Sequence, residues 1–401
     1  MRTQAGLGAD QATADFLGDL AGALLGITAP AVVRSAVALR VRFRTTLAPP
    51  AAHPRMRSRR EQTAVRPRSR PSPPRRALAG GPSTPELVTA AARAGGLGFL
   101  AGGYKTAQAL AGQIHSTRAE GVPVGVNLFV PNPVPVSDEA YRRYARSVQA
   151  EADRYGLTLP PEPIEDDDHW TDKIDLLTSA PVPWVSFTFG IPDRAVVSAL
   201  RRAGSTVLQS VTSADEARRA AASGVDALIV QAPAAGGHSA TLTPDRPLAP
   251  VRLPDLVASV RSAVALPVIA TGGIATAADV TAVMRAGAEA AMVGTVLLRT
   301  HESGASAPHK AALVDPAFAT TTVTRAFTGR PARALRNHFT DRFDALAPAG
   351  YPALHRLTGP LRKAATAAGD TRLIHLWAGT GHREARAESA ADTFERLAGR
   401  M

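Results

Sequence analysis

Seven short apolar segments recur along the chain, and stretches with helical signals separate them. This alternation constrains the fold more than any other feature. The segments are residues 97–100, 122–129, 184–189, 206–211, 227–231, 268–271 and 290–294. Strands that alternate with helices form parallel sheets, and one more strand before Gly80 would make eight. The sequence therefore predicts an α/β fold, a (β/α)8 TIM-like barrel. We expect an insertion after the third strand, at residues 131–173, and C-terminal helices beyond Thr300.

The basic charge of the chain is concentrated at its N-terminus. The formal net charge is +12, and residues 1–76 hold 14 arginines, no lysine and four acidic residues. Residues 54–76 consist mainly of arginine, proline and serine, which cannot bury enough apolar surface to fold. We therefore expect a disordered extension over residues 1–76 and a folded barrel domain over residues 77–401. Nucleic-acid binding by this arm is the weaker hypothesis, because interleaved aromatic residues and helical periodicity are missing.

Composition excludes several classes of chemistry. The chain has no cysteine, which rules out thiolate nucleophiles, thiolate zinc sites and iron–sulfur clusters. The apolar run at residues 20–33 is shorter than a bilayer requires and lacks the pattern of a good signal peptide. We accordingly expect no membrane association and a cytoplasmic location. The oligomeric state is left open.

The stretch at residues 225–238 is the centre of the predicted site. An apolar strand ends there in small residues and a turn of Gly236, Gly237 and His238. Two glycines allow the backbone to approach a ligand closely, and the imidazole can reach the same ligand. By itself this motif describes an ordinary tight turn equally well.

Other polar residues and glycines also follow the predicted strands. They are Asn127, Thr188, Gln231, the Thr271–Gly272–Gly273 turn and the Gly294–Thr295 pair. Active sites of barrels lie at the carboxyl ends of the strands, where these residues would meet. Glycine turns after the last two strands can present N–H groups to a phosphate, and an amide side chain suits the edge of a flavin ring. The pattern predicts FMN. No Gly-x-Gly-x-x-Gly follows a strand, which argues against a Rossmann site.

The acidic run at residues 165–168, followed by His169, offers a metal site as an alternative. Consecutive carboxylates on a polar loop point in different directions and usually form a solvated face. We favour the solvated face and expect no metal.

The ordered set of motifs resembles the nitronate monooxygenases, formerly called 2-nitropropane dioxygenases. The motifs stand at residues 79–87, 95–98, 125–129, 187–192, 231–238, 271–274, 294–295, 327–333 and 376–379. Members of this family are FMN-dependent barrels that oxidise alkyl nitronates with molecular oxygen. The resemblance implies FMN contacts, and together with the glycine turns it gives ten candidate cofactor residues: Asn127, Gln231, Gly236, Gly237, Gly272, Gly273, Met292, Val293, Gly294 and Thr295.

The chain also departs from the family pattern. Thr188 stands where many members carry the histidine taken to remove the α-proton of a neutral nitroalkane, and a threonine cannot do so at neutral pH. Ala232 and Ala234 replace a glycine and a glutamate, and Met292 replaces a glutamine. Residues 73–78 read Pro-Pro-Arg-Arg-Ala-Leu, a poor interior strand. We therefore interpret residues 1–76 as a segment that does not correspond to the native N-terminus of family members.

The leading hypothesis is an FMN-dependent enzyme that oxidises small anionic alkyl nitronates with O2 to carbonyl compounds and nitrite. His238 is the candidate donor to the nitro group, and Thr188 is the second candidate catalytic residue. Two alternatives stay open at this point. One is a flavin-dependent enoyl-acyl carrier protein reductase, which would use a nicotinamide nucleotide. The other is a degenerate FMN-binding barrel without turnover.

Overall fold

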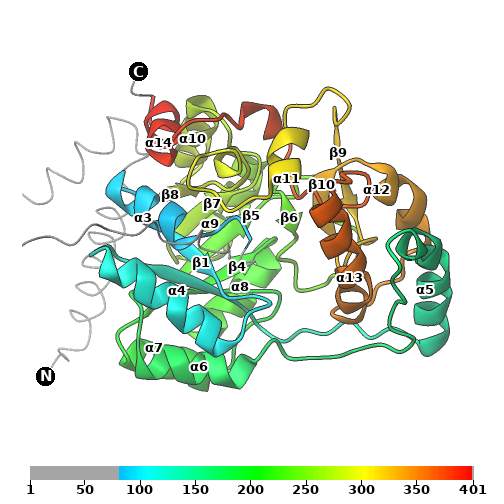
Figure 1. Cartoon of the computed structure of the whole chain (residues 1–401). Helices are drawn as coiled ribbons and strands as arrows, with labels where there is room; N and C mark the ends of the chain where they lie inside the picture. Colours follow the sequence, from blue (N-terminus) through cyan, green and yellow to red (C-terminus); the bar gives the residue numbers. More distant parts are fainter. Residues whose placement is uncertain (1–80, 400–401) are drawn as a thin grey trace, which may run out of the picture.

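The computed structural model describes residues 81–399 (Figure 1). The expected extension over residues 1–76 and the strand expected before Gly80 lie outside the described residues. Our interpretation of that extension therefore stays a prediction.

All seven predicted segments form strands of one parallel sheet. Their order is β1 (Phe99–Ala101), β2 (Gly125–Phe129), β3 (Trp184–Thr188), β4 (Thr206–Val211), β5 (Ala227–Gln231), β7 (Val268–Thr271) and β8 (Ala290–Met292). Each strand pairs in parallel with the next in this order. The carboxyl ends of the strands therefore lie at one edge, and the predicted α/β, TIM-barrel-like class is confirmed.

Helices cover the outside of this sheet, and most of them begin at a residue whose side chain caps the first turn (Figure 1). They are α3 (Pro85–Arg93), α4 (Ala107–Ala119), α6 (Trp170–Ser179), α7 (Arg194–Arg202), α8 (Ala214–Ser223), α9 (Leu253–Ala263), α10 (Ala277–Arg285) and α14 (Ala390–Leu397). Thr84, Thr106, Ser213 and Thr276 each accept a hydrogen bond from a first-turn N–H, which satisfies a group with no partner inside the helix. Helix α14 contacts both α3 and α10, which precede the two edge strands β1 and β8. The sheet is therefore curled rather than flat.

The two faces of the sheet bury different residues. Leu228 and Val230 belong to the large core under the helices, whereas Ile229 and Ile269 belong to a small cluster inside the curl. Because side chains alternate along a strand, Gln231 shares the inner face with Ile229. The same alternation turns Asn127, Thr188 and Thr271 toward the interior at the carboxyl ends of their strands.

A second core lies beside the barrel. It is built from α5 (Asp138–Asp153), α11 (Ala307–Ala312), α12 (His338–Phe343), α13 (Ala353–Ala368) and a small antiparallel sheet. That sheet has the order β6 (Gly237–His238), β10 (Ala332–Leu335) and β9 (Thr321–Thr324). The Tyr144 hydroxyl of α5 donates to the Ala326 carbonyl at 2.6 Å. The insertion and the C-terminal region therefore pack together. The antiparallel sheet was not expected from the sequence.

The insertion is shorter than expected. Helix α6 begins at Trp170 and contacts α4 and α7, as a barrel helix does, so the inserted segment ends at His169 and not at residue 173. Buried Lys173 of α6 lies 2.8 Å from Asp168. This ion pair joins the loop to the barrel. Among residues 81–399, no helix has the length and apolar character needed to cross a bilayer.

Buried Glu216 connects helix α8 to the segment that follows β6. Its carboxylate accepts hydrogen bonds from the Thr212 N–H and hydroxyl, the Thr241 hydroxyl and the Leu242 N–H. Replacement by alanine leaves these donors without a partner, and we expect the free energy of unfolding to fall by about 3 kcal/mol. Urea denaturation measures this free energy of unfolding.

The matched control is Asp215→Ala on the neighbouring position of the same helix. Asp215 is exposed and pairs with Arg218 only, so its loss should change the free energy of unfolding by no more than about 0.5 kcal/mol. Equal effects of the two substitutions would contradict the role given to Glu216.

Candidate active site

A cavity opens where the carboxyl ends of β5, β7 and β8 meet. Eight of the ten predicted cofactor residues line it: Gln231, Gly236, Gly272, Gly273, Met292, Val293, Gly294 and Thr295. Gly379 and Gly381, from the C-terminal region, close the cavity. Gly379 lies in the motif at residues 376–379, but its position at the site was not expected from the sequence. We call this space the glycine cavity.

The glycines allow backbone segments to approach each other closely. Gly272 has φ +108° and Gly273 has φ +82°, a region that favours glycine. A Cβ on Gly236 would lie 2.5 Å from the Gly379 nitrogen. The Gly379 N–H in turn donates to Thr295 Oγ1 at 2.9 Å. Backbone atoms therefore form most of the walls of the cavity, and few side chains project into it.

Several backbone donors of the glycine cavity have no partner in the described part of the chain. Within residues 81–399, no acceptor takes the N–H groups of Gly272, Gly273 and Gly294. A Cβ on Gly294 would meet no atom within 4 Å. The Thr295 hydroxyl accepts from Gly379, and within the described residues its hydrogen has no acceptor. Converging N–H groups beside a short helix such as η2 (Thr295–Leu297) fit a phosphate.

Asn127 and Thr188 lie on neighbouring strands, and neither lines the glycine cavity. Ser186 Oγ and Thr188 Oγ1 donate to Asn127 Oδ1 at 2.9 and 3.0 Å, and Ser210 Oγ lies 3.3 Å from Thr188 Oγ1. The carboxamide oxygen of Asn127 is therefore held from two sides. Its NH2 group has no acceptor among the described residues and is available to a ligand. Thr188 positions this amide.

Gln231 holds the turn that follows its own strand. Its Nε2 donates to the His238 carbonyl at 3.2 Å, and its Oε1 accepts from the Ala240 N–H at 2.7 Å. Gly237 does not line the glycine cavity either, because it pairs with Arg333 of β10 in the small sheet. These two residues shape the turn that carries His238.

His238 lies among aromatic rings where the two cores meet. Its ring centroid is 5.5 Å from that of Phe189 and 5.3 Å from that of Trp377, and its Nε2 is 2.9 Å from Thr328 Oγ1. Burial, with the positive charges of Arg330 and Arg362, lowers the pKa of His238 to about 3. The imidazole is therefore neutral near pH 7, although a histidine at its ordinary pKa would be partly protonated there.

Two buried arginines make the space around His238 positive. The Arg330 guanidinium stacks 4.1 Å over the Phe189 ring and donates to the Thr241 carbonyl. Arg362 bonds to the carbonyl of His355 and the hydroxyl of Thr358. Neither forms an ion pair with a carboxylate within residues 81–399. Burial lowers the pKa of each to about 10, so both remain charged at neutral pH.

The acidic run at residues 165–168 has a structural role. Asp168 pairs with Lys173 and accepts the Tyr104 N–H at 2.7 Å, while Asp166 pairs with Arg356 at 2.6 Å. The described part of the chain contains no group of histidine or acidic residues that could hold a metal. Ion pairing and backbone turns therefore account for this run, although part of it stays exposed.

The fold and the site define a TIM-barrel-like α/β protein with a glycine-lined cavity at the carboxyl ends of its strands and two buried arginines near His238. Comparison with known proteins gives the family. The family model for nitronate monooxygenase matches residues 73–399. The chain belongs to the nitronate monooxygenase family and is an oxidoreductase.

Relatives and solved structures agree with this assignment. A probable nitronate monooxygenase of Staphylococcus aureus is 33% identical over 315 residues, covering 77% of this chain and 88% of the relative. One from Staphylococcus saprophyticus is 33% identical over 325 residues, covering 79% and 91%. Crystal structures of nitroalkane oxidase from Streptomyces ansochromogenes share 47% identity with a TM-score of 0.76, covering 80% of this chain and 93% of that one. FabK from Thermotoga maritima shares 25% identity with a TM-score of 0.61, covering 80% and 89%.

Because the pKa of His238 is lowered in the folded protein, we predict that the free energy of unfolding depends on pH through this residue. Below pH 6.5 the unfolded chain protonates this histidine, whereas the folded chain keeps it neutral down to about pH 3. The free energy of unfolding should therefore fall as the pH drops through this window. Between pH 7 and pH 5, the wild type should lose about 2 kcal/mol more than His238→Asn.

Urea unfolding at the two pH values measures this difference. The substitution also changes the contact with Thr328, but that contribution is independent of pH, so only the slopes are compared. Parallel pH dependences of the two proteins would show that His238 titrates normally.

Proposed function

We propose that the chain binds FMN and oxidises alkyl nitronates with molecular oxygen to carbonyl compounds and nitrite. The observation that carries the proposal is the glycine cavity with its N–H groups that have no acceptor among the described residues. It is accompanied by two buried arginines near His238 that form no ion pair with a carboxylate within residues 81–399. A phosphate-bearing cofactor suits the glycine cavity, and a small anion suits the positive charge near His238. We also propose a cytoplasmic location, which rests on the sequence alone.

The residues present fit FMN. The free N–H groups of Gly272, Gly273 and Gly294, with the Thr295 hydroxyl, would hold its phosphate. The carboxamide NH2 of Asn127 would meet the polar edge of the ring, at the carboxyl end of β2. When bound, FMN would carry electrons from the nitronate to oxygen. Val293 and Met292 would complete the wall of its site.

The space around His238 favours a substrate that is already an anion. Arg330 and Arg362 contribute two positive charges, and burial makes their attraction stronger than it would be in water. Neutral His238 can still donate a hydrogen bond to a nitro group while its Nε2 contacts Thr328. Phe189, Tyr351 and Trp377 line the same region with apolar surface. This surface suits the alkyl part of a nitronate and limits the access of water.

Removal of a proton from carbon is the step for which the chain is poorly equipped. The Thr188 hydroxyl is committed to Asn127, and a base with a pKa of about 3, as for His238, is weak at neutral pH. A nitronate has already lost this proton. We therefore favour nitronates over neutral nitroalkanes, even though one structural relative is named a nitroalkane oxidase.

We predict that FMN, rather than FAD, copurifies with the protein and that Gly294→Ala weakens its binding. The added methyl would enter open space in the cavity where the phosphate is proposed to lie. Overlap with the phosphate costs more than about 1.4 kcal/mol, so affinity should fall at least tenfold. Fluorescence titration of the apoprotein with FMN measures the dissociation constant.

Gly112→Ala is the matched control, because its methyl also enters open space but at an exposed position of helix α4, outside the glycine cavity. Gly273 is a poor test site, since a Cβ there lies 2.9 Å from the Ala234 Cβ and strains the backbone with or without a ligand. Unchanged FMN affinity in Gly294→Ala, or FAD as the released cofactor, would contradict the proposed site.

The next prediction concerns substrate ionisation. At a pH where the two forms interconvert slowly, pre-formed ethyl nitronate should be oxidised about a hundredfold faster than neutral nitroethane, because only the latter needs a base. Oxygen uptake measures both rates. Thr188→His should raise the nitroethane rate selectively if its ring reaches the α-carbon, while Thr188→Ser, which keeps the hydroxyl bond to Asn127, should not.

Comparable rates for both forms in the wild type would mean that another group acts as the base. Two further observations separate the alternatives. Anaerobic reduction of the flavin by NADH would indicate a reductase, and a yellow protein without oxygen uptake would indicate a barrel that has lost turnover.

A further inference from the structure

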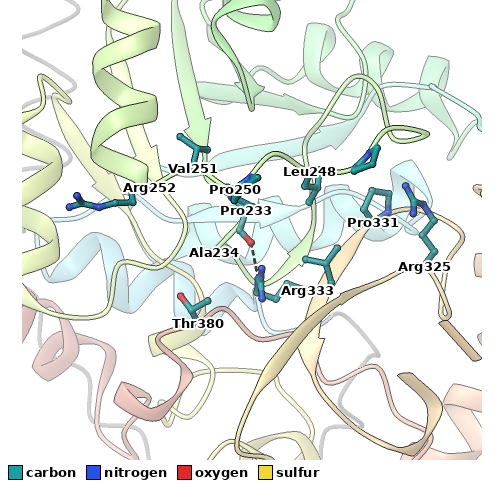
Figure 2. A pocket seen from close by; sticks show the side chains of 12 residues that line it. Pro233, Ala234, Leu248, Pro250, Val251, Arg252, Arg325, Pro331, Arg333 and Thr380 are labelled. Atoms are coloured by element: carbon teal, nitrogen blue, oxygen red, sulfur yellow. Dashed lines mark hydrogen bonds between the residues drawn. The ribbon is translucent and has the colours of Figure 1, made fainter. Parts of the chain in front are cut away.

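A second and larger cavity shares a wall with the glycine cavity. Figure 2 shows it between the turn after β5, the segment that leads into α9, and strands β9 and β10. Ala234 and Thr380 line it, and these are the residues that a Cβ on Gly273 would meet. Its volume is about 590 Å³, within the range of small-molecule sites. We call it the proline groove.

The walls of the proline groove are apolar and rigid. Pro233, Pro247, Pro250 and Pro331 line it, and proline rings lose little conformational freedom when a ligand binds. Leu248, Val251 and Val323 add aliphatic surface. No aromatic side chain of the described chain lines the groove, so it offers no platform on which a nucleobase could stack.

Charge in the groove comes from arginines alone. Arg333 lies in the middle, where its Nε donates to the Pro233 carbonyl at 2.7 Å (Figure 2). Its Nη1 donates to Thr321 Oγ1 at 3.0 Å, which leaves Nη2 for a ligand. Arg325 and Arg252 lie toward opposite ends of the groove (Figure 2). Within residues 81–399, none of the three pairs with a carboxylate.

Two details show that this charge lacks compensation. The Nε of Arg325 is buried and has no hydrogen-bond acceptor among the described residues. Burial also lowers the pKa of Arg333, as expected for a guanidinium that has lost water without gaining a counter-charge. An anion in the groove would supply this counter-charge.

We propose that the proline groove binds an aliphatic anion, an alkyl phosphate or alkyl carboxylate, with its head group at Arg333 and its chain along the proline walls. The planar guanidinium matches both head groups. The groove is separate from the glycine cavity and from the space around His238. Its ligand is therefore neither the proposed cofactor nor the proposed nitronate.

The test is calorimetric titration of the full chain in the presence of excess FMN, so that a phosphate cannot enter the glycine cavity. The probes are octyl phosphate, octanoate and octanol, with inorganic phosphate and adenosine monophosphate as comparisons. We expect at least one octyl anion to bind tenfold or more tightly than octanol and inorganic phosphate. Equal affinity for the octyl anions and octanol would overturn the proposal, and so would tighter binding of adenosine monophosphate.

Two variants assign any binding to the groove. Leu248→Glu introduces a carboxylate at a lining residue without altering the hydrogen bonds of Arg333, and it should weaken binding of the octyl anion at least tenfold. Arg325→Gln should weaken it as well. The control Leu346→Glu changes an exposed leucine that does not line the groove and should leave affinity unchanged. Thermal unfolding checks that each variant is folded, and unchanged affinity in both groove variants would overturn the proposal.

Discussion

The site depends on the close approach of two backbone segments, the turn after β5 and residues 378–381 of the C-terminal region. A Cβ on Gly379 would lie 2.7 Å from the Ala234 carbonyl, and the Thr380 N–H donates to that same carbonyl at 3.1 Å. This contact joins the barrel to the second core. It also forms the wall between the glycine cavity and the proline groove, so both spaces depend on glycines that admit no side chain.

Buried positive charge is the second constraint, and it opposes stability. Arg330 has no exposed surface, and its guanidinium is held by carbonyls and an aromatic face rather than by a carboxylate. Removing such a group from water is costly unless it is paired. The same charge lowers the pKa of His238. This arrangement lowers the free energy of unfolding, and it also attracts an anion strongly.

The sequence was sufficient for those parts of the structure that depend on local pattern. The seven strands followed from apolar periodicity, and the glycines after β7 and β8 followed from their position at strand ends. Closure of the cavity by Gly379 and Gly381 depends on packing between distant segments, which no local pattern records. The bonds of Gln231 to its own turn and the neutral state of His238 likewise depend on burial. The expected end of the insertion was too late, because α6 already begins at Trp170 and the ion pair that allows burial of Lys173 is a tertiary contact with Asp168.

Thr188 connects the inner face of the barrel to the proposed chemistry. Side chains alternate between the two faces of strand β3, so residue 188 faces the interior of the barrel at the carboxyl end of the strand. A histidine at this position could act on a substrate. In this chain the hydroxyl of Thr188 donates a hydrogen bond to Asn127, in a network that includes Ser186 and Ser210. These short polar side chains satisfy one another and leave a single amide NH2 for a ligand. We propose that a site of this kind provides orientation and electrostatic attraction instead of proton removal, which suits a substrate that arrives as an anion.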